Sequence, residues 1–476
     1  MNLPQIGLIT FGDNRDHEWQ AVFGRMTEPR HQQAIACLRR LPIELHADPA
    51  VARQKEEIDA QVDALKAAGV EALVAHTPCW TSPNLVVRGI QRLGLPTVVL
   101  TNKSPATHGT VGFLGAAGTL DQIGYPHLRV RADLEGQGAE QIGACALPYF
   151  RAAAAQARLA GQTFGLFGGR SLGIDTGTFD PLQWKRLFQV DTEHIDQLEI
   201  IRRADMIDPA RTAAMIAWLE RTTARVDYGK GKLTPEKLAF QANCYLATTE
   251  LIAERGLDFV AIKCMPDLTN FYVPQCLSAA LLPGPYDADG AKAPVMMACE
   301  ADADAALTME MLKQVSGGKP VLFMDVSYID DEAQVFYMPN CGAFCSWYAA
   351  RADDPAENLR RVELRPANRP GGGAITYFTA APGPLTFARL YRVEGQYRMA
   401  IVRGATVSIP PEKYEAFVAA RGPHQLPTAF ARLEVDIDAF IASFASNHIL
   451  AVDGVYVQEL VHLCQLLSVK PVVYER

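Results

Sequence analysis

APVMMAC, residues 293–299, leads directly into an acid, Glu300. Residues 303–315 then have the pattern of apolar residues that is typical of a helix. A short apolar run that contains a proline near its start is typical of a buried strand. A strand that passes through a polar end into a helix is the repeating unit of α/β folds. In such folds, ligands bind at the carboxyl ends of the strands. This stretch therefore predicts an α/β sheet with an acid at its functional edge.

The same arrangement recurs 25 residues later, where KPVLFM at residues 319–324 leads into Asp325. A carboxylate at the end of a buried strand is costly unless it is paired or binds a metal. A third polar group, His448, follows an apolar, helix-like stretch near the C-terminus. Glu, Asp and His side chains are suitable ligands for a divalent metal ion.

Each of these residues also has an ordinary structural interpretation. Glu300 could be an acid that caps the helix after it, because the helix dipole favours acids there. Asp325 could be a strand-end or turn aspartate, and His448 a structural histidine. The occurrence of all three, spread over two predicted domains, favours a shared metal site with Glu300 and Asp325 as the catalytic acids.

The composition describes a globular protein of several domains. The chain has 476 residues, which is too many for one ordinary core, and 49% of them are hydrophobic. A net charge of −8 argues against nucleic acid as the partner, and no stretch is apolar enough to span a membrane. The N-terminus lacks the pattern of a secretory signal, and the ten cysteines are scattered, so we expect a reduced, cytoplasmic protein. A zinc site at Cys341 and Cys345 is disfavoured because no neighbouring Cys or His completes it.

The order of the predicted elements gives the domain organisation. Strand and helix patterns alternate twice, over residues 1–162 and again over residues 163–318, where the second region carries Glu300. The segments after residue 320 are rich in β patterns punctuated by Gly and Pro, with helices at the end. We therefore expect two Rossmann-like parallel-sheet domains, followed over residues 319–476 by a β-rich C-terminal domain with helices that carries Asp325 and His448.

Three further polar or aromatic residues follow predicted strands. Arg15 lies in a loop after the first strand, Trp80 follows a later strand of the same domain, and Lys263 ends a strand of the second domain. At the ligand-binding edge of a sheet, an arginine can hold a substrate and a tryptophan can stack on a sugar. The alternatives are ion pairs with nearby acids for Arg15 and Lys263, and an interface position for Trp80.

At this point the pattern resembles the L-fucose isomerase / L-arabinose isomerase superfamily over almost the whole length. Four segments carry the resemblance, of which the last two are the more specific. They are GGRSLG at 168–173 with Asp196 after it, DFVAIK at 258–263, CEAD at 299–302, and GPLTFARL at 383–390. The second acid is Asp325 rather than Glu, and Asn340 stands before Cys341, so the chain looks closer to the L-fucose isomerase branch.

The resemblance implies a set of ligands and an assembly. In that family a Glu, an Asp and a His hold a manganese ion, and the matching positions here are Glu300, Asp325 and His448. Arg15, Trp80 and Asn447 match positions that contact the sugar, and the first domain then reaches a neighbouring subunit. The resemblance therefore implies a homo-oligomer, a hexamer. The family often has Lys-Gly-Gln where this chain has Lys263, Cys264 and Met265. This difference affects the expected identity of the sugar more than the expected type of reaction.

These observations predict a metal-dependent aldose–ketose isomerase. An open-chain sugar, either like L-fucose and D-arabinose or a 6-modified hexose, would react through an enediolate. Mn²⁺ is the first choice of ion, with Mg²⁺ or Co²⁺ as alternatives. A metal-dependent epimerase or aldolase would need the same chemistry. A sugar-binding protein without catalysis is the alternative of another class.

Overall fold

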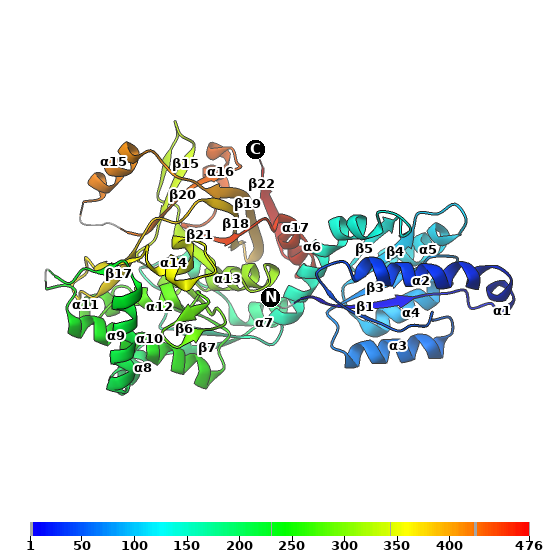
Figure 1. Cartoon of the computed structure of the whole chain (residues 1–476), viewed down its shortest axis with the longest axis horizontal. Coiled ribbons are helices and arrows are strands. Elements are labelled where there is room, and N and C mark those ends of the chain that lie inside the picture. Colours follow the sequence, from blue (N-terminus) through cyan, green and yellow to red (C-terminus); the bar gives the residue numbers. More distant parts are fainter. Residues whose placement is uncertain (1–2, 230, 343, 423–425, 476) are drawn as a thin grey trace. The chain divides into compact units, whose positions relative to one another are not determined.

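The computed structural model describes residues 3–229, 231–342, 344–422 and 426–475. It divides into two compact units, one formed by Met1–Arg158 with Gln458–Leu467 and the other by Leu159–Val457 with Ser468–Arg476 (Figure 1). The expected boundary after residue 318 lies inside the second unit, and the division into three domains stays a prediction. Among the described helices, none combines the length and the hydrophobicity that a membrane crossing requires.

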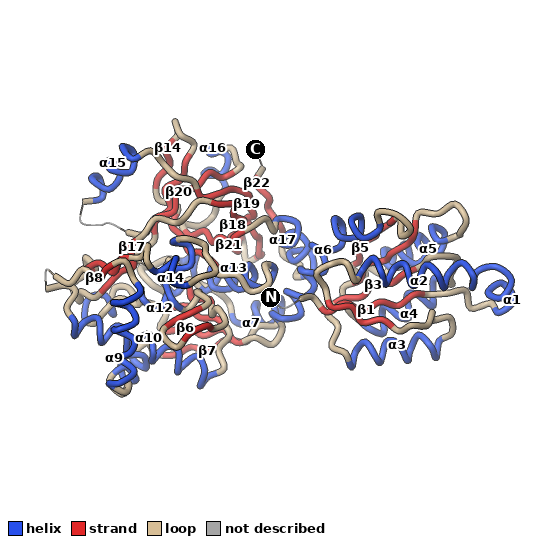
Figure 2. The backbone as a smooth tube through the Cα atoms, viewed as in Figure 1, coloured by secondary structure: helices blue, strands red, loops and turns tan. Residues whose placement is uncertain are grey.

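The first unit is built on a parallel sheet in the order β2-β1-β3-β4-β5. Alternate residues of β1 point to opposite faces, so Ile6 and Leu8 pack in one apolar layer, while Ile9 and the following Phe11, just beyond the strand, pack in the other. Helices cover both faces (Figure 2). The elements are β1 (Gln5–Thr10), α1 (Asp16–Glu18), a π-helical turn (Trp19–Phe23), α2 (Gly24–Leu38), β2 (Glu44–Ala47), α3 (Lys55–Ala67), β3 (Ala72–His76), α4 (Pro83–Leu93), β4 (Thr97–Asn102), α5 (Gly109–Gln122), β5 (His127–Ala132), α6 (Gly138–Leu159) and α17 (Val457–Leu466).

The second unit begins with another parallel sheet, in the order β12-β9-β6-β7. Its strands are short and almost fully buried at the centre, which is typical of a sheet covered on both faces. The elements are β6 (Thr163–Phe167), α7 (Pro181–Phe188), β7 (Asp191–Ile195), α8 (Leu198–Ala204), α9 (Pro209–Thr222), β8 (Arg225–Val226), α10 (Pro235–Arg255), β9 (Phe259–Ile262), α11 (Asp267–Phe271), α12 (Cys276–Leu281), β10 (Tyr286–Asp287), β11 (Gly290–Ala291), β12 (Met296–Ala298) and α13 (Ala303–Val315), with 3₁₀ turns at Asp175–Gly177 and Cys299–Ala301.

An antiparallel sheet completes the second unit, in the order β13-β21-β18-β19-β20-β15-β14, with β22 added in parallel beside β19. A smaller sheet joins β17, β16 and β8. The elements are β13 (Val321–Asp325), β14 (Tyr328–Asp330), β15 (Val335–Pro339), a 3₁₀ turn (Ser346–Ala349), α14 (Pro355–Leu359), β16 (Glu363–Pro366), β17 (Ala374–Tyr377), β18 (Gly383–Val393), β19 (Gln396–Thr406), α15 (Pro411–Arg421), β20 (Thr428–Leu433), α16 (Ile437–Ser443), β21 (His448–Asp453) and β22 (Lys470–Tyr474).

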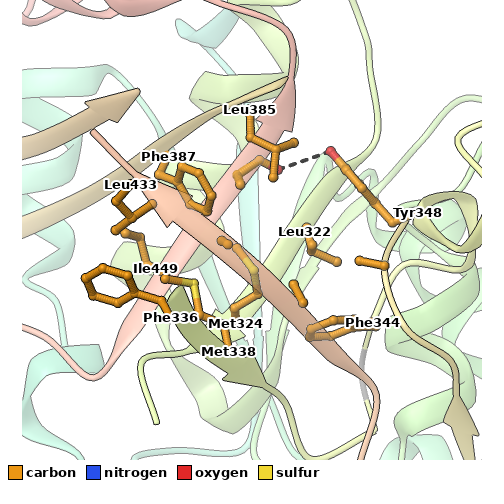
Figure 3. Close-up of a cluster of buried hydrophobic side chains, with 14 of the residues drawn as sticks. Leu322, Met324, Phe336, Met338, Phe344, Tyr348, Leu385, Phe387, Leu433 and Ile449 are labelled. Atoms are coloured by element: carbon orange, nitrogen blue, oxygen red, sulfur yellow. Dashed lines mark hydrogen bonds between the residues drawn. The ribbon is translucent and has the colours of Figure 1, made fainter. Parts of the chain in front are cut away.

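The core of this antiparallel sheet decides where two polar residues of the site point. Leu322 and Met324 of β13 and Ile449 of β21 belong to one buried apolar cluster on one face (Figure 3). Because side chains alternate along a strand, Asp325 and His448 point to the opposite face.

The predicted fold class is confirmed, since parallel sheets with helices precede a β-rich region. One detail differs from the sequence-based expectation. Asp325 ends a strand of the antiparallel sheet, and its partner His448 begins a strand, β21, that was not predicted. The apolar run of β21 is short and stands between two helical patterns, which obscured it.

Candidate functional site

Three side chains from distant parts of the sequence converge on one point of the second unit. The Nε2 atom of His448 lies 3.1 Å from Oε2 of Glu300 and 3.2 Å from Oδ1 of Asp325. Each residue offers one ligand atom, and these atoms all lie within 4.8 Å of one another. We call Glu300, Asp325 and His448 the ligand trio. Two carboxylates and one imidazole at this spacing form a donor set that suits a divalent ion.

Strand pairing places two members of the trio together. Asp325 is the last residue of β13 and His448 is the first of β21, and the two are direct partners in the antiparallel register. Directly opposed residues of such a pair lie side by side on the same face. The ring of Phe323, two residues before Asp325, lies 4.6 Å from the His448 ring and packs against it.

The backbone at Glu300 has an unusual conformation. Glu300 follows β12 in a 3₁₀ turn and has a φ of 58°, and Ala301 has a φ of 55°. Residues with a β-carbon are strained in this left-handed region, and such strain concentrates at functional sites. The turn directs the Glu300 side chain, which is only 9% exposed, toward His448.

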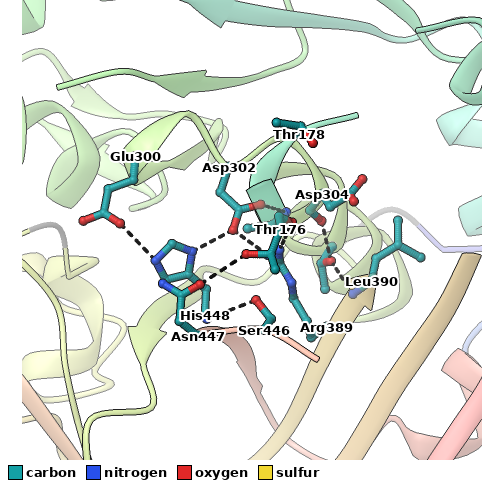
Figure 4. Close-up of polar contacts among 12 residues, drawn as sticks. Thr176, Thr178, Glu300, Asp302, Asp304, Arg389, Leu390, Ser446, Asn447 and His448 are labelled. Atoms are coloured by element: carbon teal, nitrogen blue, oxygen red, sulfur yellow. Dashed lines mark hydrogen bonds and ion pairs between the residues drawn. The ribbon is translucent and has the colours of Figure 1, made fainter. Parts of the chain in front are cut away.

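Behind His448 lies a buried acid that the sequence reasoning did not single out. Asp302 accepts a hydrogen bond from Nδ1 of His448 at 2.7 Å, and the same carboxylate oxygen pairs with Nη1 of Arg389 at 2.8 Å (Figure 4). When the ring is neutral and Nδ1 donates to Asp302, the lone pair of Nε2 faces Glu300 and Asp325 and is available to a metal ion. The second oxygen of Asp302 accepts from the backbone N–H of Ala305 at 2.8 Å and caps α13. Asp302, rather than Glu300, is therefore the acid that caps this helix.

Burial and charge set the protonation states around the trio. Burial raises the pKa of Glu300, against the opposing effect of His448. Burial also acts to raise the pKa of Asp302, but Arg389 and His448 outweigh it and hold that pKa at about 2. Burial disfavours a charged His448, yet its hydrogen bonds to the three carboxylates raise its pKa well above the usual value. The carboxylates around His448 thus stabilise a positive charge at the centre of the trio.

Comparison with known proteins identifies the family. The family model of the L-fucose isomerase first N-terminal domain matches residues 3–161, and that of the L-fucose isomerase C-terminal domain matches residues 338–475. Together the two matches cover more than half of the chain. The chain belongs to the L-fucose isomerase family. The predicted resemblance is therefore confirmed, and this family member is an aldose–ketose isomerase.

One curated relative of this L-fucose isomerase family member is a sulfoquinovose isomerase from Alkalicoccus urumqiensis. It is 20% identical over 348 residues, which cover 71% of this chain and 73% of the relative. Among solved structures, an ABC transporter periplasmic solute binding protein from Actinobacillus succinogenes 130z with bound D-allose aligns over 66% of this chain and 92% of its own. Its identity is 12% and its TM-score 0.17, which is too low to support a conclusion about fold or ligand.

The four residues predicted to contact substrate are distributed over both units. In the first unit, Arg15 pairs with Asp13 at 2.6 Å and Trp80 is partly buried after β3. In the second unit, Lys263 pairs with Asp267 at 2.7 Å, and Asn447 accepts a hydrogen bond from Thr176 at 3.3 Å beside His448. The ion pairs of Arg15 and Lys263 are those expected of a structural role, and the substrate contacts of all four residues stay predictions.

The thiol nearest to Cys341 in the structure is not the one nearest to it in the sequence. Cys341 Sγ lies 3.3 Å from Cys299 Sγ, whereas Cys345 is buried in the apolar core of the antiparallel sheet. Cys299, Glu300 and Cys341 offer ligand atoms within 4.8 Å of one another. Cys345 is the cysteine closest to Cys341 in the sequence, whereas Cys299 is 42 positions away.

Asp302→Asn should reduce the Mn²⁺ affinity of the protein by ~10- to 100-fold, as is usual when the partner of a metal-binding histidine is lost. Asparagine caps a helix about as well as aspartate, so α13 should remain capped. Calorimetric titration with Mn²⁺ measures the affinity. Asp304→Asn is the matched control, because Asp304 is also buried at the start of α13 but bonds to Tyr397 instead of His448. Equal affinities for the two variants would contradict this role of Asp302.

Proposed function

We propose that the isomerase is metal-dependent and that Glu300, Asp325 and His448 hold the ion. The convergence of the trio carries this proposal, because His448 Nε2 faces both carboxylates within 3.2 Å. Mixed oxygen and nitrogen donors suit Mn²⁺ first, with Mg²⁺ and Co²⁺ as alternatives. The donor set fits such an ion, because Asp302 holds the Nδ1 atom of His448 and thereby orients the Nε2 atom toward the two carboxylates.

The reaction needs a proton to leave C2 of an open-chain aldose and a proton to arrive at C1. A bound divalent ion would supply Lewis acidity toward the O1 and O2 atoms of the sugar. We assign the two proton transfers to Glu300 and Asp325, which would act on the same face of an enediolate. A hydride shift from C2 to C1 would use the same residues. Solvent deuterium in the product would support the enediolate route, and its absence the hydride shift.

We propose the substrate class from the positions at which this sequence differs from the family pattern. L-Fucose and D-arabinose share their hydroxyl configuration at C2–C4 and are the first aldoses to consider. The curated relative is named for sulfoquinovose, a hexose with a sulfonate at C6. Met265 stands where the family often has a glutamine, so one polar contact to the sugar is missing. We therefore include hexoses modified at C6 among the proposed substrates.

Product analysis tests this function directly. Protein loaded with Mn²⁺ is incubated with L-fucose, D-arabinose, sulfoquinovose and unmodified hexoses, and the products are identified by NMR. A ketose from at least one aldose is the expected result. An epimeric aldose or a cleaved sugar would instead indicate an epimerase or an aldolase, and the proposed reaction would be wrong.

We also propose that the active protein is a homohexamer in which Arg15 and Trp80 of one subunit reach the site of a neighbour. All ten cysteines carry free thiols, which supports our proposal of a cytoplasmic location.

In the proposed shared site, Trp80 would stack on the sugar and add apolar contact without touching the metal.

Trp80→Ala should raise KM for the aldose by about tenfold, the effect of losing roughly 1.4 kcal/mol of ring contact. The Mn²⁺ content should not change, because Trp80 is not a ligand. Light scattering of the wild-type protein should give a mass well above that of the 52.0 kDa chain. A fully active monomer would refute the shared site and leave the metal chemistry intact.

A further inference from the structure

A small cavity in the second unit adjoins the ligand trio. The residues that line it and bear on its chemistry are Cys264, Met265, Thr269, Cys276, Cys341 and Arg369. The sulfur of Cys341 lies within 4.8 Å of a carboxylate oxygen of Glu300. Cys341 therefore belongs both to the wall of the cavity and to the surroundings of the trio. Met265, the position at which the family's glutamine is missing, lies in the wall of this same cavity.

The loop that carries Arg369 is fixed to its surroundings by backbone hydrogen bonds. The N–H of Gly371 donates to the carbonyl of Thr269 at 2.9 Å, and the N–H of Gly373 donates to the carbonyl of Lys232 at 2.7 Å. In return, Nζ of Lys232 donates to the carbonyl of Arg369 at 3.0 Å. Side chains presented by such an anchored loop are held in place with little loss of entropy on binding.

The glycines of this loop are required by close packing. A β-carbon at Gly371 would lie 2.2 Å from the carbonyl oxygen of Tyr272, and one at Gly372 would lie 2.2 Å from that of Lys232. Gly372 also has a φ of +75°, a conformation that other residues adopt only with strain. The segment therefore packs closely against the backbone of Tyr272 and Lys232, and this packing fixes the position of Arg369 at the cavity.

The guanidinium of Arg369 has no acidic partner in the described part of the chain, although it is partly buried at the cavity. Other arginines nearby are paired: Arg365 binds Glu363 at 2.8 Å and Arg389 binds Asp302 at 2.8 Å. A guanidinium presents a planar fork of donors that matches two oxygens of a sulfonate or phosphate. Among the described residues, the guanidinium of Arg369 thus forms no ion pair with an acid, and it lines a cavity beside the trio.

We propose that Arg369 binds a tetrahedral oxyanion at the C6 end of an aldose whose O1 and O2 atoms lie at the ligand trio. The inference rests on the proposed function and names its substrate class: a hexose with a 6-sulfonate or a 6-phosphate. Met265 offers no hydrogen bond to a C6 hydroxyl, and Arg369 supplies the charge that selects an anion instead. Arg369 is then a specificity-determining residue of this isomerase.

The test compares Arg369→Gln with the wild-type protein on charged and neutral aldoses. KM for the anionic hexose should rise by ~10- to 100-fold, the range for losing a hydrogen bond to a charged group. KM for L-fucose or D-arabinose should stay the same. Arg369→Lys keeps the charge but loses the fork, so it should show a smaller rise. Arg365→Gln is the matched control, because Arg365 is close in sequence but does not line the cavity.

Separate arms identify the anion and keep the test independent of catalysis. Sulfoquinovose and a hexose 6-phosphate are compared as substrates, and whichever has the lower KM identifies the group. Calorimetric titration with inorganic sulfate should show binding to the wild-type protein and none to Arg369→Gln. Equal sulfate binding, or an unchanged KM for the anionic hexose, would overturn the role of Arg369. If no aldose is isomerised by the Mn²⁺-loaded wild-type protein, the proposed function fails instead, and the sulfate titration still decides whether Arg369 binds anions.

Discussion

Glu300→Gln is expected to lower kcat by at least ~100-fold, the typical effect of removing an acid–base group, while the protein stays folded. The amide has nearly the same shape as the carboxylate, so the packing of this buried side chain is kept. It supplies neither a proton acceptor nor an anionic ligand. Because Asp302 caps α13, the substitution removes no cap, and the unfolding midpoint should change little. Steady-state kinetics and thermal unfolding of the same preparation measure both effects.

Two further variants make the result specific. Asp325→Asn should show a comparable loss, since Asp325 is the other carboxylate within 3.2 Å of His448 Nε2. Glu310→Gln is the matched control: Glu310 is a buried acid of α13 that pairs with Lys313 and lies outside the trio. A Glu300→Gln enzyme with normal turnover and lowered stability would show that Glu300 has a structural role, and the assignment of the trio would be wrong.

Removal of divalent metal is expected to abolish turnover, and Mn²⁺ to restore it. In the absence of the ion, the two acids of the trio lack the Lewis acid that stabilises the enediolate. The sheets should remain intact, because their cores are apolar and include none of the three ligands. Mn²⁺ should also raise the unfolding temperature, since an ion that binds only the native state stabilises it.

Activity assays after chelation and dialysis, with metal content measured on the same sample, check this prediction. Circular dichroism before and after chelation provides the control for folding. Readdition of Mg²⁺ and Co²⁺ in parallel ranks the alternative ions. Full activity in a sample shown to contain no metal would contradict the proposed dependence on a divalent ion.

The apolar runs of the sequence were sufficient to predict the fold class, although the short strand β21 was missed. Buried strands have a simple pattern, and the acids that end two of them, Glu300 and Asp325, were visible as polar residues in costly positions. The predicted trio is brought together by the structure, although its metal and its roles remain to be tested.

The partners around the trio could not be predicted, because they depend on contacts between distant segments. Arg389 lies within an apolar strand, which signals a buried acid somewhere, but Asp302 is 87 positions away. The residue types around Glu300 do not indicate that its backbone adopts a left-handed conformation. The cavity at Arg369 is formed by several separate segments, so a guanidinium that has no acidic partner among the described residues is recognised only in three dimensions.

The pairing of Asp325 with His448 has a consequence for folding. The two ligands face each other only when β13 and β21 pair in one particular register, which closes a chain segment of 448 − 325 = 123 residues. A shift of a single residue would turn one strand's side chains to the opposite face and separate the ligands. Such long-range pairing forms late and slowly. A metal ion that binds only the aligned pair would therefore favour the correctly assembled sheet over its misaligned alternatives, so that the proposed ion would also act as a check on strand alignment.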